Sequence, residues 1–221
     1  MTRPPQSPPV KLRDRAYDSF TDNLLSRRIR PGQFVTQREL SALTKMPLGA
    51  IRELIPRLEA DGLVTTVPQR GMQITHIDVE LVRNAFQLRI ILELEAAAHF
   101  AVHASDQARA ALEKSHRDIL EAAERGIDDA LVERAQNVDW EFHETLIDHL
   151  QNRIVSDVYR VNAIKIRLIR QELIALQPEI VLSVIGDHMK IIEALNSRNP
   201  DTARAALRQH LEKSRRRALK I

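Results

Sequence analysis

The stretch TQRELSALTKMPLGAIRELIPRLEADGLVTTVPQRGMQIT, residues 36–75, decides the fold of the amino-terminal part of the chain. Thr36 followed three residues later by Glu39 is a capping-box signature, which predicts a short helix over about 37–44. After a turn at KMP, the segment LGAIRELIPRLEAD predicts a second helix that ends at Gly62. LVTTV and MQIT then predict two short strands, joined by a tight turn at PQRG.

The residues before this stretch, 11–28, place apolar side chains at near-helical spacing, and IRPGQF ends that helix with a Pro-Gly turn. The order helix, helix, turn, helix, hairpin is that of a winged helix-turn-helix over residues 11–75. Pro56 interrupts the pattern, because proline inside a helix removes a backbone hydrogen bond. The apolar spacing continues past Pro56, so we expect a helix with a bend or a break there.

The rest of the chain shows only helical periodicity after a linker over 76–80. The segments with helical apolar spacing are 79–103, 106–125, 128–150, 152–176, 180–197 and 200–219. Short joints between long helices predict an antiparallel all-helical bundle of six or seven helices over 81–221. The expected fold is therefore mainly α, with an amino-terminal winged helix-turn-helix and a carboxyl-terminal helical bundle.

The charge of the chain is unevenly distributed. Residues 1–75 carry 12 Lys and Arg against 7 Asp and Glu, a balance of +5, whereas residues 76–221 carry 21 against 23, a balance of −2. A basic module joined to a neutral one is typical of a nucleic-acid-binding domain with a partner domain, although a chance surface bias gives the same numbers. The chain has no cysteine, which excludes disulfides and thiolate metal sites.

The first ten residues, MTRPPQSPPV, contain four prolines and lack the apolar core of a signal peptide. This composition predicts a disordered arm over 1–10. No apolar run approaches the length of a membrane span. We therefore expect a cytoplasmic protein without a membrane partner.

The segment DWEFHETLIDHL, residues 139–150, puts a carboxylate and an imidazole one helical turn apart in the middle of an apolar seam. These are Asp139 and His143, and burying such a carboxylate is costly unless a partner compensates. His188 and His210 occupy apolar stripes on two later helices. One carboxylate oxygen and three imidazole nitrogens from three helices suit a divalent cation, and they leave positions open on an octahedral metal.

Other interpretations stay open from spacing alone. A single inward histidine is often a hydrogen-bonded core residue, and Asp139 with His143 can form an intrahelical pair. A rival pair one turn apart, His99 and His103, has no further ligand in line and ranks second. The remaining histidines are expected away from the site: His149 off the ligand face, His76 in the linker and His116 on the surface.

At this point the residues match a known pattern. The amino-terminal part resembles the GntR family of bacterial transcription regulators, through IRPGQFVTQREL, IRELIPRLEADGLV and PQRG. The carboxyl-terminal part resembles the FCD ligand-binding domain of the FadR subfamily. The matching segments are LRIILELEAAA (88–98), DWEFHETL (139–146), GDHMKIIEAL (186–195) and ARAALRQHL (203–211). Together the resemblance covers residues 11–215.

The resemblance also implies a ligand set. In metal-binding members of that subfamily the ligands are one aspartate and three histidines, and this pattern falls on Asp139, His143, His188 and His210. These are the residues that helical spacing places inward. The implied cofactor is a divalent metal ion, with Zn as the first expectation and Ni or Mn as alternatives.

The DNA-reading arginines of the family fall on Arg38 and Arg52, and the wing tip falls on Arg70-Gly71, where glycine lets the backbone approach the minor groove. The alternative for the two helix arginines is ordinary solvated charge or an ion pair with a neighbouring glutamate, Glu39 or Glu53. The DNA-binding set predicted in this way is Thr36, Gln37, Arg38, Lys45, Leu48, Gly49, Arg52, Arg70 and Gly71.

One position departs from the family. Many relatives have an arginine near the start of the second motif helix, where this chain has Leu48. Leucine cannot form a bidentate contact with guanine, although it can touch a thymine methyl. DNA binding is therefore expected, while the usual operator of the family does not carry over.

Two further polar residues on apolar stripes, Arg89 and Asn162, predict an effector pocket beside the metal. An arginine next to a metal with open positions suits a small carboxylate, and members of the resembled subfamily are tuned by such acids. The alternative for Arg89 is a buried pair with Glu93, four residues further along the same helix.

We therefore expect a DNA-binding transcriptional regulator, for instance a repressor, that binds a palindromic operator as a homodimer. A small carboxylate effector beside the metal would modulate its affinity for the operator. The alternatives are a purely structural metal and a metal-dependent, hydrolase-like enzyme. The winged helix argues against an enzyme, as does the lack of a further inward acid or base, so no catalytic residue is expected.

Overall fold

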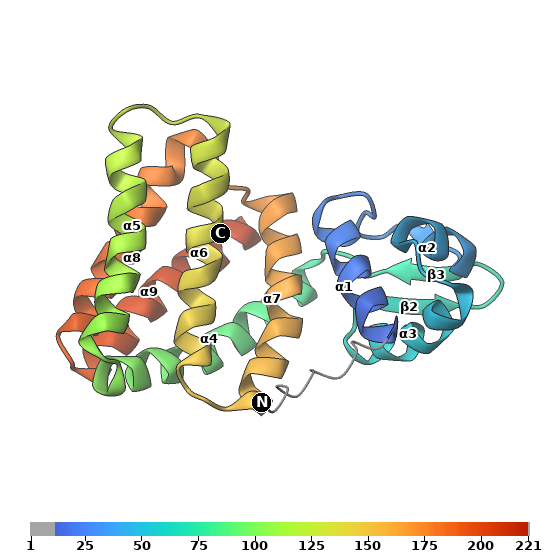
Figure 1. Cartoon of the computed structure of the whole chain (residues 1–221), viewed down its shortest axis with the longest axis horizontal. Helices are drawn as coiled ribbons and strands as arrows, with labels where there is room; N and C mark the ends of the chain where they lie inside the picture. Colours follow the sequence, from blue (N-terminus) through green and yellow to red (C-terminus); the bar gives the residue numbers. More distant parts are fainter. Residues whose placement is uncertain (1–11, 221) are drawn as a thin grey trace, which may run out of the picture. The chain divides into compact units, whose positions relative to one another are not determined.

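The computed structural model describes residues 12–220, and within them the chain forms nine helices and three short strands (Figure 1). The chain divides between Ile77 and Asp78 into two compact units. The disordered arm predicted over 1–10 lies outside the described residues. No helix within the described residues is long and apolar enough to cross a membrane.

The first unit is a winged helix-turn-helix. Its helices are α1 (Leu12–Leu25), α2 (Gln37–Thr44) and α3 (Leu48–Ala60), and its strands are β1 (Phe34–Val35), β2 (Val64–Val67) and β3 (Gly71–Ile74). The strands form one antiparallel sheet in the order β1-β3-β2. Thr36 caps α2 as predicted: its hydroxyl accepts from the Glu39 backbone N–H, and the Glu39 carboxylate accepts from the Thr36 backbone N–H.

Two details of this unit differ from the sequence-based expectation. Strand β1 was not predicted, because two residues are too few to show strand alternation; Val35 is buried and pairs with Met72. The break at Pro56 is absent, since α3 runs without interruption from Leu48 to Ala60. Fully buried Leu54 and Leu58 on either side of Pro56 hold the helix together across the missing hydrogen bond.

The backbone conformation at Gly71, and not only its place in the wing, explains why glycine occurs there. Its φ is +91°, a conformation that side chains rarely adopt, and a Cβ there would lie 2.7 Å from the backbone oxygen of Val35. The close approach of β3 to β1 therefore requires glycine at this position.

The second unit consists of six helices, as the periodicity predicted. They are α4 (Val79–His103), α5 (Asp106–Ala123), α6 (Asp129–Asp148), α7 (Arg153–Leu173), α8 (Pro178–Asn196) and α9 (Pro200–Leu219). Most begin with a side-chain cap: Asp78, Ser105, Asp128, Asn152 and Asn199 each accept a hydrogen bond from the backbone of the first turn. Local sequence thus fixes where the helices start.

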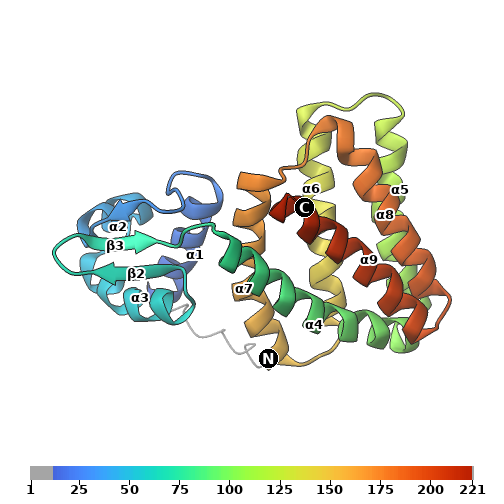
Figure 2. The same ribbon diagram turned by 180° about the vertical axis from the view of Figure 1, so that it is seen from behind.

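The packing of the second unit brings segments far apart in the sequence together. Helix α4 packs against α9, α7 and α6, and α5 packs against α8 and α6 (Figure 2). The apolar core includes Phe100 of α4, Phe142 of α6 and Leu195 of α8. This arrangement directs one face of α4, α6, α7, α8 and α9 inward, where a set of polar side chains is also buried.

Arg109 of α5 ties the ends of two other helices together. Its buried guanidinium donates to the carbonyl oxygens of Leu195 at 2.5 Å and Ala101 at 2.7 Å, and to those of Phe100 and Ala104 at 3.2 Å. Three of these oxygens lie at the carboxyl end of α4, including its cap residue Ala104, and the fourth lies in the last turn of α8. A cation at two helix carboxyl ends also complements the helix dipoles.

We predict that Arg109→Met lowers the free energy of unfolding of the helical unit by about 2 kcal/mol or more, because buried carbonyl oxygens lose a charged donor. Urea unfolding followed by circular dichroism measures the effect. Arg117→Met on the same helix is the control, since the Arg117 side chain is largely exposed and pairs only with Glu113. Equal stability of the two variants would contradict the role given to Arg109.

Candidate metal centre

Three buried histidines from three helices meet in the interior of the second unit. His143 of α6, His188 of α8 and His210 of α9 each offer one ring nitrogen, and the three nitrogens lie within 4.8 Å of one another. Such a group could hold a metal ion. Sequence spacing already placed these three side chains inward, because each lies on the buried stripe of its helix.

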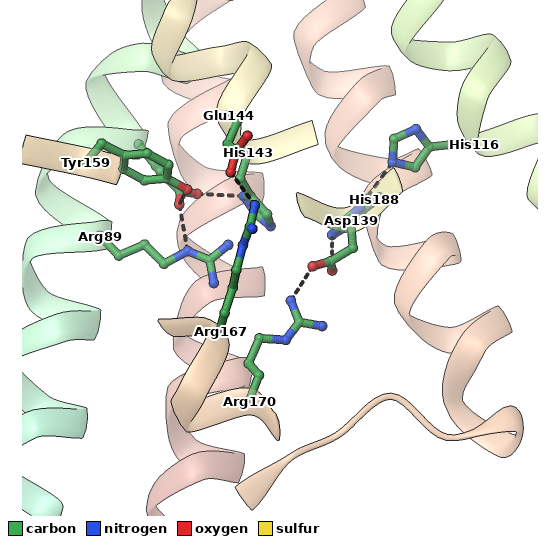
Figure 3. Close-up of polar contacts among 10 residues, drawn as sticks. Arg89, His116, Asp139, His143, Glu144, Tyr159, Arg167, Arg170 and His188 are labelled. Atoms are coloured by element: carbon green, nitrogen blue, oxygen red, sulfur yellow. Dashed lines mark hydrogen bonds and ion pairs between the residues drawn. The ribbon is translucent and has the colours of Figure 1, made fainter. Parts of the chain in front are cut away.

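Asp139 lies one turn before His143 on α6, and its carboxylate is completely buried. One carboxylate oxygen, Oδ2, is bound by Nη1 of Arg170 from α7, and the other, Oδ1, lies 3.4 Å from Nε2 of His188 (Figure 3). Burial would raise the pKa of this carboxyl, but the charge of Arg170, with a smaller contribution from Arg89, outweighs burial and holds the pKa well below its usual range. Asp139 is therefore an ionised carboxylate beside the histidines, and it forms an ion pair with Arg170.

Four atoms of this group are buried without a hydrogen-bond partner in residues 12–220. They are Oδ1 of Asp139, Nε2 of His143, Nε2 of His188 and Nδ1 of His210. An unpaired buried polar atom costs free energy, and native proteins rarely leave several together. A divalent cation held by the three histidine nitrogens would remove most of that cost. Asp139 is outside that group of three but lies 3.4 Å from His188, from where it would supply a fourth ligand, so the donor set fits a metal of the borderline class.

The other ring nitrogen of His143 is held by a carboxylate. Its Nδ1 lies 2.7 Å from Oε2 of Glu93, and Oε1 of Glu93 accepts hydrogen bonds from Arg89 at 2.6 Å and from Tyr159 at 2.7 Å. Figure 3 shows Arg89, Tyr159 and His143 converging at this point. Burial lowers the pKa of His143 well below its ordinary value, so the ring is neutral and donates through Nδ1. Nε2 is then free to bind a metal.

The same holds for the other two histidines. Burial lowers the pKa of His188 to about 3 and brings the pKa of His210 well below its ordinary value. Neutral imidazoles are the form that binds metals, so all three rings are ready for a cation near neutral pH.

The prediction that His116 lies on the surface is wrong, because this residue of α5 is buried. It is 0 % exposed, and its Nε2 lies 3.1 Å from Nδ1 of His188. The signal that could have found it is the spacing of Leu112, His116 and Ile119, which are all buried on one face of α5. His116 therefore belongs to the surroundings of the candidate ligands.

The two predicted effector residues are both buried, but their groups have protein partners. Arg89 pairs with Glu93, as the alternative interpretation proposed, although its Nη1 has no partner within residues 12–220. The side-chain amide of Asn162 donates to the Ala85 backbone oxygen at 3.0 Å. The rival histidine pair, His99 and His103, lies elsewhere on α4, where Nδ1 of His99 is 3.2 Å from Nδ1 of His149.

Two features border the histidine group. A cavity of about 300 Å³ between α8 and α9 ends on His210 and is also lined by Asp187, Lys190, Lys213 and three neighbours. On α6, the ring of Trp140 lies under the guanidinium of Arg170, with 4.6 Å between the Arg170 Cζ and the ring centroid. Arg167 contacts the same ring from 5.2 Å.

The residues predicted to contact DNA lie on the surface of the first unit. All are exposed except Gly71, which is partly buried, and they gather on α2, the start of α3 and the wing. The ion pairs among the described residues of this unit involve Asp14, Arg13, Arg57 and Asp61, and neither Arg38 nor Arg52 takes part in one. The two helix arginines are thus available to a ligand.

Comparison with known proteins agrees with this architecture. Residues 12–74 match the family described as bacterial regulatory proteins, gntR family, and residues 84–213 match the FCD domain. The repressor RspR of Escherichia coli K12 is 23% identical over 210 residues, which cover 93% of this chain and 88% of that protein. The Nta operon transcriptional regulator of Aminobacter aminovorans is 28% identical over 190 residues, 86% of each chain.

Solved structures show the same fold. The chain superposes on McbR/YncC of Escherichia coli with a TM-score of 0.73 at 18% identity, covering 93% of this chain and 95% of that one. A GntR regulator of Rhodococcus sp. RHA1 gives a TM-score of 0.74 at 17% identity, with 94% and 97% covered. The family matches and these relatives identify a regulator that binds DNA, not an enzyme. The chain belongs to the GntR family of bacterial transcription regulators, with an amino-terminal helix-turn-helix domain and a carboxyl-terminal FCD domain.

Proposed function

We propose that this regulator binds a divalent metal ion through Asp139, His143, His188 and His210, and that a small carboxylate effector binds beside the metal and changes the affinity for operator DNA. Such a protein fits the metal-binding FadR subfamily and acts in the cytoplasm as a homodimer on a palindromic operator. The observation that carries the proposal is the set of four unpartnered, buried acceptor atoms on these four residues.

The unpartnered atoms favour a metal over a core of hydrogen-bonded histidines. In a hydrogen-bonded core both nitrogens of each ring would find partners. Here His143 and His188 each use one nitrogen, toward Glu93 and His116, and leave the other nitrogen bare. This one-sided pairing is the arrangement that metal-bound histidines have, with the outer nitrogen held by the protein.

The donor set suits zinc first, and nickel or manganese as alternatives. Three imidazoles and one carboxylate are borderline ligands, and four protein ligands leave positions open on a metal that accepts five or six. When bound, the metal supplies a Lewis-acidic point that a carboxylate oxygen can coordinate. The protein supplies the charge around it, because Nη1 of Arg89 and Nε of Arg170 are buried donors without a partner in residues 12–220.

The surroundings favour an anionic effector. Arg89 and Arg170 face the histidine group, and the two carboxylates that they bind, Glu93 and Asp139, are already engaged with them. The cavity lined by His210 is also lined by Lys190 and Lys213, which both pair with Asp187, and a small acid that enters it would reach the edge of the histidine group. Asn162 lies on α7 between Tyr159 and Arg170, so it remains a candidate for an additional polar contact.

Helix α4 offers a route from the effector to the DNA-binding unit. It begins at Val79, directly after the boundary between the two units, and it carries both Arg89 and Glu93. A carboxylate that draws Arg89 away from Glu93 would change the contacts of α4 at its middle. Only an effector that favours one arrangement of α4 over another can shift operator affinity.

In the DNA-binding unit we propose that Arg38, Arg52 and Arg70 contact phosphates and base edges. Lys45 and Gln37 lie near them, and the Thr36 hydroxyl is used as the cap of α2, so its part is to set the start of that helix. Leu48 is 38% exposed at the first residue of α3, where it can reach a thymine methyl. Nothing lies within 4 Å of a Cβ placed on Gly49, so glycine is not required there by packing and leaves room for a DNA backbone.

Of the predictions about function, the first concerns the metal. The full-length protein, stripped with a chelator, is expected to bind one zinc per chain in isothermal titration calorimetry. His188→Ala and Asp139→Ala should each weaken binding by more than about 100-fold, because even the outer partners of metal ligands are worth about 10- to 100-fold. His99→Ala is the matched control and should leave the affinity unchanged. Undiminished binding in His188→Ala would refute the site.

The second prediction concerns the effector. In a thermal-shift screen, small carboxylates are expected to raise the melting temperature of the zinc-loaded protein and to lose this effect after chelation, since a ligand stabilises the state that it binds. The same acids should change the affinity of a labelled operator in fluorescence anisotropy. If melting temperature falls on chelation while no carboxylate has any effect, the metal is structural and the effector hypothesis is wrong.

The third prediction concerns DNA. Arg52→Ala should weaken operator binding by about 1–3 kcal/mol, or roughly 5- to 150-fold, because it removes a donor at the groove-facing helix. Arg28→Ala, outside the motif, is the control for the loss of one positive charge in the same unit. Both variants are compared by anisotropy at one salt concentration. Equal losses would mean that Arg52 acts only through general electrostatics.

A further inference from the structure

The buried residue His116 has no part in the proposed metal and effector contacts, yet it touches one of the ligands. Its Nδ1 lies 2.8 Å from the backbone oxygen of Leu112, and its Nε2 lies 3.1 Å from Nδ1 of His188. The two rings are on different helices, α5 and α8, which pack against each other. Figure 3 shows His116 on the far side of His188 from Arg170.

The Leu112 carbonyl oxygen fixes which ring nitrogens carry hydrogens in this series of contacts. A carbonyl oxygen only accepts, so Nδ1 of His116 must carry the hydrogen that it shares with Leu112. The Ser115 oxygen also lies 3.2 Å from Nδ1 of His116, but its hydroxyl donates to the Leu112 oxygen at 2.9 Å, so toward Nδ1 it is an acceptor and leaves this direction unchanged. A buried imidazole is neutral, so Nε2 of His116 has no hydrogen and accepts. The donor in the contact between the two rings is therefore Nδ1 of His188.

This assignment leaves Nε2 of His188 without a hydrogen, and another acceptor lies close to it. Oδ1 of Asp139 is 3.4 Å away, and neither atom has a hydrogen-bond partner in residues 12–220. Two bare acceptor atoms this close together in a buried site repel, and a cation bound to both would remove the repulsion. In the other tautomer, Nε2 of His188 would carry the hydrogen. A small movement that shortens the 3.4 Å separation and aligns the two groups would then let it donate to Asp139, which would satisfy both atoms and close the site to a metal.

We propose that His116 is a positioning residue that holds His188 in the tautomer with a bare Nε2, and so prevents a hydrogen bond between His188 and Asp139 that would compete with a divalent cation. The proposal rests on the metal site proposed above. This role differs from that of Glu93 at His143. Glu93 holds its histidine with a charged carboxylate, whereas His116 is a neutral ring whose own hydrogen is fixed by the Leu112 carbonyl oxygen.

Three substitutions at one position separate this role from packing. His116→Gln can place its amide oxygen near the position of Nε2 and keep an acceptor for His188. His116→Asn can still donate to Leu112 but is too short to reach His188. His116→Phe keeps a ring of similar size with no acceptor. Circular dichroism verifies that each variant is folded before it is measured.

The first measurement is made on the metal-free protein. Long-range nitrogen–proton NMR correlations of the His188 ring report which nitrogen carries the hydrogen. Wild type and His116→Gln are expected to show the Nδ1–H form, and His116→Asn and His116→Phe the Nε2–H form. Persistence of the Nδ1–H form in His116→Asn would overturn the proposal, and this result does not depend on whether a metal binds.

The second measurement is zinc affinity in competition with a chelator. His116→Asn and His116→Phe are expected to bind zinc about 10- to 100-fold more weakly, which is the usual effect of losing an outer partner of a ligand. His116→Gln is expected to bind close to the wild-type affinity. Equally weak binding by Gln and Asn would show that His116 acts only by packing. If wild type itself binds no metal, the proposed function fails, while the tautomer measurement still tests His116 separately.

Discussion

The helical unit depends on one constraint, which is that an ionised carboxylate and three neutral imidazoles are enclosed in an apolar interior. His143, His188 and His210 come from three helices, and Asp139 lies one turn before His143 on α6, so their meeting point requires α6, α8 and α9 to keep their relative positions. A cation shared by the four would hold those helices together and remove the cost of bare acceptors at the same time. Occupation of the proposed site would then contribute to the stability of the unit.

The charges around the centre balance in pairs. Arg170 offsets Asp139, and Arg89 offsets Glu93, so the metal-free interior has no large uncompensated charge. A divalent cation would disturb this balance by adding positive charge beside two arginines. The small anionic effector proposed above would restore it, which would be a physical reason for the two ligands to bind together.

Much of this architecture follows from sequence, because helical periodicity and caps are local. The four candidate ligands could be predicted from residues on buried stripes, and Thr36 with Glu39 marked the start of α2. What depends on tertiary contacts could not be predicted. His116 needed the packing of α5 on α8, β1 needed its pairing with β3, and the unbroken α3 needed the burial of Leu54 and Leu58 to outweigh Pro56.

Trp140 is the only tryptophan in the chain, and it is the direct neighbour of Asp139. Its ring lies under the guanidinium of Arg170, the same group that binds the Asp139 carboxylate. Light emission from an indole responds to a cation lying against its face. The intrinsic fluorescence of Trp140 therefore reports on the charge next to Asp139. It needs no label, and no second indole contributes to the signal.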